Sequence, residues 1–177
     1  YLQRLAPVAA ARAEALWLEG REVQIDAATR PAFELAIQRN SPWLIGELAY
    51  WRRQAGLRDE LPAEMIAEPY RLSITGRWRE AAERWTQIGC PYEAALALAD
   101  SDEPRTVRRS ITALQELGAR AAAAIVARRL RARGIRGVPR GPRPRTRENP
   151  AGLTARELEV LTLLAEGWRN AQIAQRL

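Results

Sequence analysis

Short apolar-periodic stretches separated by Gly and Pro constrain the fold of this chain most strongly. Ala, Leu, Arg and Glu dominate these stretches, and all four are strong helix formers. No stretch alternates apolar and polar residues with the two-residue period of a half-buried strand. The sequence therefore predicts an all-α chain built from short helices.

The predicted helices begin and end near these Gly and Pro residues. Ser41 precedes Pro42 as an N-cap precedes a proline at the first helical position. Gly89, Gly118 and Gly134 each follow an apolar-periodic run, where a left-handed C-terminal cap favours glycine. The expected helices cover residues 2–19, 31–39, 43–55, 62–75, 78–88, 91–100, 104–117, 119–133, 154–166 and 170–177.

Residues 69–100 resemble a tetratricopeptide-type helical hairpin. Gly76 permits the tight turn, the small Ala81 lets the paired helix approach, and Trp85 fills the groove between hairpins. The resemblance covers one unit, and no clean period of about 34 residues recurs elsewhere. The expected fold class is therefore all-α, with helical hairpins stacked as an irregular tetratricopeptide-like solenoid over residues 1–133, then a linker and a partial helix-turn-helix.

Tryptophans are frequent in the predicted solenoid. We expect their rings to pack in the core, because large aromatic side chains bury most of their surface in folded proteins. A ligand or peptide groove on a concave surface remains the alternative for some of them. The tryptophans concerned are Trp17, Trp43, Trp51, Trp78 and Trp85.

The residue composition removes several kinds of enzymatic site. The chain has no histidine and no lysine, which excludes His-based catalysis, a Walker A phosphate loop and a Lys Schiff base. Acidic pairs such as Asp59–Glu60, and the group Asp100, Asp102 and Glu103, lie beside turns, where solvated caps are the ordinary explanation. We expect no enzymatic activity, no cofactor and no metal site in this chain.

The ends of the chain and its single cysteine bear on its cellular context. No stretch is apolar enough for a secretory signal or a membrane span, so we expect no membrane partner and a cytoplasmic location. Cys90 alone cannot form an internal disulfide or a Cys-based zinc cluster. The chain starts with Tyr1 and stops at Leu177 within an apolar-periodic run, so we expect a piece of a longer protein.

Charge is distributed unevenly along the sequence. Residues 105–147 hold much of the basic charge against one acidic residue, Glu116, whereas residues 1–104 contain more acids than arginines. Such a basic block favours a polyanion partner, most often nucleic acid, although a solvated basic helix and linker is the alternative. Residues 134–152 are rich in Pro, Gly and Arg and are expected to form an extended linker.

Residues 153–177 carry the most specific pattern. Thr154 followed three residues later by Glu157 predicts a capping box, and Leu153 can pack on Leu158 as a hydrophobic staple. Further apolar residues recur at helical spacing and predict one buried stripe. These residues are Val160, Leu161, Leu163, Leu164 and Ala165.

A second short helix follows this one in the sequence. Gly167 is expected to end the first helix, and Asn170 is expected to cap the second. Ile173, Ala174 and Leu177 give the second helix its apolar face, with the small Ala174 where two helices cross closely. The segment therefore predicts a helix, a tight turn and a helix with a shared core.

This segment resembles the LuxR-type helix-turn-helix. The matching runs are Leu-Thr-x-Arg-Glu-x-Glu-Val-Leu, Ala-Glu-Gly and Asn-x-x-Ile-Ala-x-x-Leu. The resemblance implies that the second helix is the scaffold helix and that a base-reading recognition helix follows it. Because the chain stops at Leu177, we expect residues 153–177 to be poorly packed in isolation. The residues that carry the resemblance are Leu153, Thr154, Arg156, Glu157, Glu159, Val160, Leu161, Gly167, Asn170, Ile173, Ala174 and Leu177.

The resemblance implies a transcriptional regulator that binds double-stranded DNA. Residues 1–133 would then form a helical regulatory arm that senses a protein or small-molecule effector, or that pairs with a second protomer. The layout resembles the large ATP-binding LuxR regulators, whose nucleotide-binding module would precede Tyr1. The alternative is a tetratricopeptide-like protein-interaction scaffold without sequence-specific DNA binding. Non-specific phosphate contacts are expected from Arg140, Arg143, Arg145 and Arg147.

Overall fold

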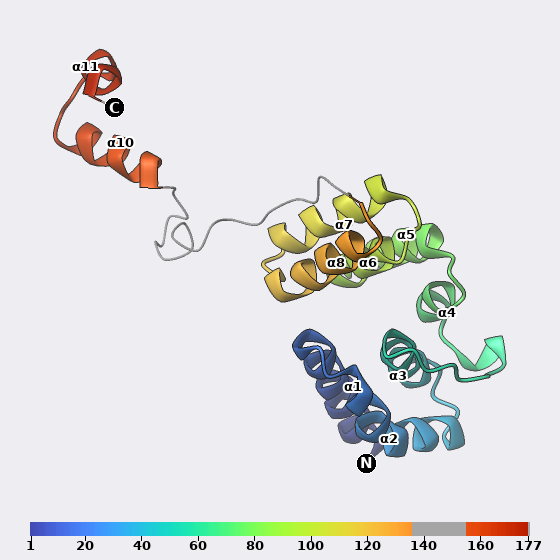
Figure 1. Cartoon of the computed structure of the whole chain (residues 1–177). Coiled ribbons are helices and arrows are strands. Elements are labelled where there is room, and N and C mark those ends of the chain that lie inside the picture. The colour runs from blue at the N-terminus through green and yellow to red at the C-terminus, as the bar shows by residue number, and fades with distance from the viewer. Residues whose placement is uncertain (136–154, 177) are drawn as a thin grey trace. The chain divides into compact units, whose positions relative to one another are not determined.

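The computed structural model describes residues 1–135 and 155–176 (Figure 1). Every regular element in these residues is helical, which confirms the predicted all-α class. The chain divides into two compact units, residues 1–139 and 140–177. We refer to residues 1–135 as the arm. Within the described residues, no helix combines the length and the apolar character that a membrane crossing requires.

The arm is a succession of short helices. Two single 3-10 turns, η1 (Glu22–Gln24) and η2 (Ala63–Met65), interrupt this succession. The α-helices of the arm are α1 (Leu2–Glu19), α2 (Ile25–Gln38), α3 (Pro42–Gln54), α4 (Glu68–Ile74), α5 (Trp78–Ile88), α6 (Pro91–Ala99), α7 (Pro104–Glu116) and α8 (Arg120–Ala132).

Helix α2 starts earlier than its sequence predicted. The expected helix began at Pro31, whereas α2 begins at Ile25 and carries Pro31 inside it. A proline inside a helix removes one hydrogen bond and costs about 3 kcal/mol. Tertiary contacts outweigh this cost, because Ile25 is fully buried and the buried Thr29 accepts a 3.2 Å hydrogen bond from Arg52 of α3.

Helix α4 is shorter than predicted. The expected helix covered residues 62–75, but the backbone is extended at Ile66 and at Ala67, which precedes α4. Pro69 explains the break, since its ring would clash with the carbonyl group four residues earlier in a continuous helix. The Ala67 amide instead donates a 3.0 Å hydrogen bond to the Pro42 carbonyl oxygen, which ties the start of α4 to the start of α3.

Glycine and proline set most helix ends as the sequence predicted. Gly89, Gly118 and Gly134 have φ angles of 86°, 77° and 77°, the left-handed region that a C-terminal cap requires. Pro42 is the first residue of α3 and Ser41 is its N-cap, as predicted, but the Ser41 side chain makes no capping hydrogen bond. The proline thus marks this helix start without a side-chain cap.

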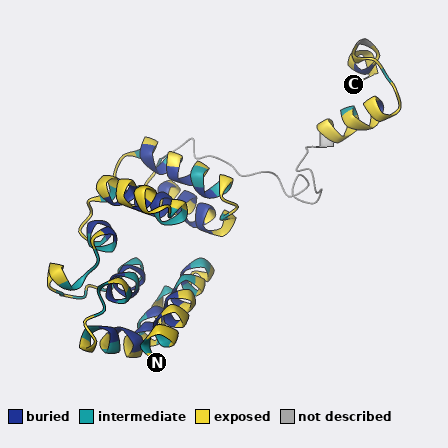
Figure 2. Cartoon of the chain, turned by 180° about the vertical axis from the view of Figure 1, so that it is seen from behind, coloured by how far each residue is buried: buried dark blue, intermediate teal, exposed yellow. Residues whose placement is uncertain are grey.

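Successive helices of the arm pack on one another (Figure 1). Helix α1 also packs on α3 and on α8, so the last helix of the arm returns to the first. Figure 2 shows the buried residues on the faces that these helices turn toward each other. Each fully buried large apolar side chain contributes roughly 1.5–3 kcal/mol of stability. The largest of these are Trp17, Ile25, Ile45, Leu48, Ile111, Leu114 and Leu130.

The tetratricopeptide-type features predicted in residues 69–100 correspond to α4 and α5. Gly76 turns the chain between the two helices with a φ of 79°. Ala81 is fully buried, and the buried ring of Trp85 packs against Tyr70 of α4 with ring centroids 4.8 Å apart. Both residues are buried, and Trp85 contacts Trp43 of α3 as well as the paired helix α4, so its ring lies where the hairpin meets the preceding helix.

The tryptophans divide into buried and exposed rings. Trp17, Trp51 and Trp85 are buried, which confirms the core prediction for them. The prediction is wrong for Trp43, which is 53% exposed at the first turn of α3. Its ring makes edge-to-face contacts with Tyr70 at 6.1 Å and with Trp85 at 6.3 Å. Trp78 is half-buried at the start of α5.

One acidic residue that the sequence assigned to a solvated turn, Asp59, is partly buried and pairs with a buried arginine. Arg52 is only 6% exposed, and both Asp59 carboxylate oxygens accept hydrogen bonds from its guanidinium at 2.8 Å. Asp26 accepts another at 2.7 Å, and the guanidinium lies 4.7 Å from the centre of the Phe33 ring. This cluster joins α2, α3 and the loop that follows α3.

Candidate nucleic-acid interface

Helix α10 (Ala155–Ala165) ends as the sequence predicted. Gly167 has a φ of 84°, and its amide donates to the Leu164 carbonyl oxygen at 2.9 Å. The Trp168 amide donates to the Leu163 carbonyl oxygen at 3.0 Å. This pair of bonds is a Schellman motif, which fixes the direction of the chain as it leaves the helix.

Helix α11 (Asn170–Arg176) is capped one residue earlier than predicted. The Arg169 carbonyl oxygen accepts the Ile173 amide at 3.0 Å, so Arg169 is the N-cap and Asn170 is the first helical residue. The Arg169 amide donates to Gln172 Oε1 at 3.0 Å, as in one half of a capping box. The N-cap position that the sequence assigned to Asn170 is therefore taken by Arg169, whose amide is satisfied by the glutamine at the third helical position.

The apolar faces of α10 and α11 are only partly covered. Leu163 and Ile173 are buried, whereas Leu158, Leu161 and Leu164 are 37%, 51% and 46% exposed. These three leucines lie on one helical stripe and leave an apolar surface available. This exposure agrees with the expectation that two helices of the motif cannot cover their own core.

Other residues of the predicted motif lie at the surface. Ala174 is exposed, so the prediction that it marks a close helix crossing is wrong for the described residues. Val160 is half-buried, and Glu157 is exposed. Arg156 is exposed and donates a 3.2 Å hydrogen bond to Glu159 one turn later, which orders the polar face of α10.

Part of the predicted interface lies outside the described residues. The phosphate contacts, the capping box and the hydrophobic staple therefore stay predictions from the sequence. The residues concerned are Arg140, Arg143, Arg145, Arg147, Leu153, Thr154 and Leu177.

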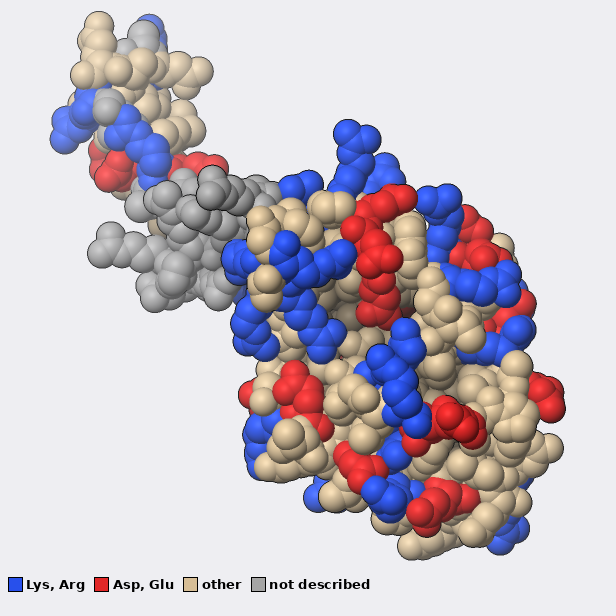
Figure 3. Space-filling model, turned by 45° about the vertical axis from the view of Figure 1, so that its right-hand side comes forward, with Lys and Arg blue, Asp and Glu red and all other residues tan. Residues whose placement is uncertain are grey.

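Helices α7 and α8 carry the described part of the basic block, and the arginines at the end of α8 lie next to the linker. Arg129 donates to Gln54 at 2.8 Å, and Arg133 donates to backbone oxygens of the loop between α6 and α7, so both stabilise the arm itself. Arg128 and Arg131 are exposed. Figure 3 shows basic side chains grouped at one end of the arm, with acidic and basic side chains mixed over the rest of that face.

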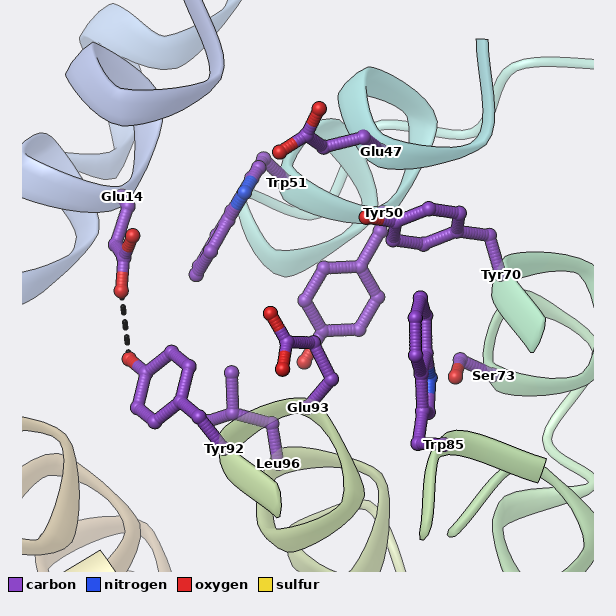
Figure 4. Close-up of a pocket in the computed structure, with 10 residues that line it drawn as sticks. All are labelled: Glu14, Glu47, Tyr50, Trp51, Tyr70, Ser73, Trp85, Tyr92, Glu93 and Leu96. Atoms are coloured by element: carbon purple, nitrogen blue, oxygen red, sulfur yellow. Dashed lines mark hydrogen bonds between the residues drawn. The ribbon is translucent and has the colours of Figure 1, made fainter. Parts of the chain in front are cut away.

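The arm also contains a cavity that the sequence analysis did not identify (Figure 4). Its volume is about 80 Å³, and tyrosines, tryptophans and glutamates line it. Tyr50 and Trp51 follow Glu47 by three and four residues, so the three side chains share one helical face. This spacing is the sequence signal that could have indicated the cavity. No group of His, Cys, Asp or Glu in the described residues is arranged to hold a metal ion.

The comparisons with known proteins bear on the C-terminal unit. Residues 151–177 match the model of the GerE family, described as bacterial regulatory proteins of the luxR family. No curated protein and no solved structure matches the chain. The match covers α10 and α11 and the turn between them. Residues 151–177 are therefore similar to the luxR-family segment of bacterial regulatory proteins, as their sequence predicted.

Proposed function

We propose that this protein is a DNA-binding transcriptional regulator of the luxR type, with its helical arm as the sensing part. The observation that carries the proposal is the luxR-family match of residues 151–177. The exposed apolar stripe of Leu158, Leu161 and Leu164 supports it, because a helix-turn-helix domain needs such a face for the helices that complete its core. A transcriptional regulator works in the cytoplasm of a bacterium, so the proposal includes that location.

The basic linker has a defined task in this proposal. Four arginines before the luxR-type segment, Arg140, Arg143, Arg145 and Arg147, would contact phosphates without reading sequence. Each neutralised phosphate releases counterions, which favours binding at low salt. The linker would then keep the regulator close to DNA, while the helix-turn-helix would fix its position and orientation on the duplex.

The arm has the second task. Its helices enclose a cavity of about 80 Å³, and its last helix returns to its first, so a ligand in the cavity can affect the packing of the whole arm. A small-molecule effector is the partner that this arrangement supports best. A protein effector, a second protomer and an upstream ATP-binding module also belong to the proposal, on resemblance alone.

Fluorescence anisotropy of a labelled 30-base-pair duplex tests the DNA-binding part directly. Residues 1–177 hold the first two helices of the motif, so the assay measures sequence-independent binding, with a dissociation constant of about 10⁻⁵ M at moderate salt. Changing the four linker arginines to Gln should weaken binding by about tenfold or more.

The matched control removes the same charge from the arm. Arg4, Arg12, Arg39 and Arg58 are exposed, and their change to Gln should leave duplex binding within about twofold of wild type. If both quadruple variants lost the same duplex affinity, the loss would follow from the lower net charge of the chain and not from contacts of the linker arginines. Absence of duplex binding in the wild type would favour the alternative, a helical protein-interaction scaffold.

A further inference from the structure

The cavity of the arm is enclosed by four neighbouring helices and α1. Figure 4 shows the Glu93 carboxylate between the rings of Trp51, Tyr92 and Trp85. The cavity holds about 80 Å³, well below the roughly 300–1,000 Å³ of pockets for drug-sized ligands, so only a molecule of a few heavy atoms fits it. The residues that line it are Glu14 of α1, Glu47, Tyr50 and Trp51 of α3, Tyr70 and Ser73 of α4, Trp85 of α5, and Tyr92, Glu93 and Leu96 of α6.

The charge of the cavity is negative and uncompensated. Three glutamates line it, namely Glu14, Glu47 and Glu93. No basic residue that the structure describes lines it, since all 28 basic residues of the chain are arginines and none of those described is at the cavity. Within residues 1–135, no arginine forms an ion pair with any of these three carboxylates. Elsewhere in the arm, acids such as Asp26 and Asp59 do pair with arginine. The cavity carboxylates therefore differ from these acids, because no arginine of residues 1–135 neutralises their charge.

The negative charges of Glu14 and Glu93 repel the carboxylate of Glu47 in the cavity. Burial raises the pKa of Glu47, and the charges of Glu93 and Glu14 raise it further. One hydrogen bond is available, from Tyr92 Oη to Glu14 Oε1 at 2.6 Å. A ligand that brings positive charge and N–H donors would relieve this repulsion and satisfy the remaining carboxylate oxygens.

The aromatic walls add the second requirement on the ligand. Tyr70 packs edge-to-face on Trp85 at 4.8 Å, and Tyr50 packs edge-to-face on Trp51 at 5.3 Å, so the rings are held in place before a ligand arrives. Ring faces attract cations, most strongly when the cation is desolvated, and they also pack against aliphatic carbon. Rings and carboxylates together select an organic cation over an anion or a neutral ligand.

We propose that this cavity binds a small alkylammonium ion, with its ammonium group at the glutamates and its aliphatic carbon against the aromatic rings. A hard metal cation fits less well, because it needs several oxygen ligands at one point and the described residues offer no such group. The small volume favours a free amine over the lysine side chain of a peptide. Binding of the ion is separate from DNA binding, and only its role as an effector rests on the proposed function.

Isothermal titration of the 177-residue chain with 1,4-diaminobutane at pH 7.5 and constant ionic strength tests this inference. A dissociation constant of about 1 mM or lower is expected, with a change in the fluorescence of the cavity tryptophans. The neutral analogue 1,4-butanediol has the same length and should not bind measurably. Equal binding of the diol, or no binding of the diamine, overturns the proposal.

Two variants locate the site. Glu47→Gln removes one cavity carboxylate and should weaken diaminobutane binding by about tenfold, while thermal melting reports that the variant is folded. Glu34→Gln makes the same charge change on the exposed face of α2 and should leave binding unchanged. Equal losses in both variants would show general attraction to a negative surface and overturn the assignment to the cavity.

A third ligand distinguishes the two sources of an ammonium group. Nα-acetyl-lysine amide carries the side chain that a protein partner would insert. Tighter binding of 1-aminobutane than of this amide, which also carries one ammonium group, supports a free amine, and the reverse order overturns the free-amine assignment. Because no DNA is present in these titrations, their outcome is independent of the duplex-binding test.

Discussion

Tyr92 Oη donates a 2.6 Å hydrogen bond to Glu14 Oε1 and so joins α6 to α1 across 78 positions of the sequence. Burial raises the pKa of Tyr92, and the accepting carboxylate raises it further, so the hydroxyl stays protonated at neutral pH. The bond fixes one wall of the cavity to the first helix of the arm.

Tyr92→Phe should lower the free energy of unfolding by about 1–2 kcal/mol, because it deletes a hydrogen bond to a charged acceptor while keeping the ring. Urea unfolding of the full chain measures the change. Tyr1→Phe is the control, since Tyr1 is 92% exposed and its hydroxyl should contribute nothing measurable. An unchanged unfolding midpoint in Tyr92→Phe would show that the bond does not stabilise the arm.

Asp59→Asn should destabilise the arm by about 3 kcal/mol, because it leaves the buried guanidinium of Arg52 with one carboxylate partner fewer. Arg30→Gln is the matched comparison. It also removes an ion pair, with Asp26, but its side chain is mostly exposed, so the loss should stay below about 0.5 kcal/mol. Similar losses in the two variants would contradict the interior role of Asp59.

Glu47→Gln should raise the stability of the ligand-free protein at pH 7. Burial, then the charges of Glu93 and Glu14, raise the pKa of Glu47 above its ordinary value of 4.5. A raised carboxyl pKa means that the folded state favours the protonated form, so this contribution to stability is present below pH 4.5 and is lost as pH rises through the folded-state pKa. The gain in Glu47→Gln should therefore disappear when unfolding is measured below pH 4.5. A variant less stable than wild type at pH 7 would contradict this account.

Gly46→Ala should destabilise the arm by about 1–3 kcal/mol through overpacking. A Cβ atom at Gly46 would lie 2.7 Å from Tyr70 Cβ and 2.9 Å from Tyr70 Cγ, so α3 and α4 would have to separate. The same movement would shift Tyr70 in the cavity wall. Thermal melting of the variant, followed by circular dichroism, checks the prediction, and a melting temperature equal to wild type would refute it.

Local sequence patterns were sufficient for much of the fold. Glycines such as Gly89 and Gly118 set helix ends because few other residues adopt their positive φ cheaply, and this preference is visible without tertiary context. The prediction of α2 started at Pro31 because the tertiary contact that supports the preceding turn, from Arg52 to Thr29, comes from a residue 23 positions away in the sequence. Helical periodicity indicates that a residue faces inward but not which helix it meets.

The same limit applies to the sites. The luxR-type segment was predictable because its pattern is contiguous, whereas the cavity combines residues from five helices. Asp59 looked like a solvated turn residue because its partner, Arg52, belongs to the preceding helix and the fold alone buries the pair.

The salt dependence of duplex binding tests the central claim most directly. If the four linker arginines contact phosphates, the slope of log K against log salt should be about 3.6 units shallower in their quadruple Gln variant than in wild type. The arm variant with four exposed arginines changed should keep the wild-type slope. A wild-type affinity that does not depend on salt, or equal slopes in wild type and the linker variant, would contradict the proposed interface.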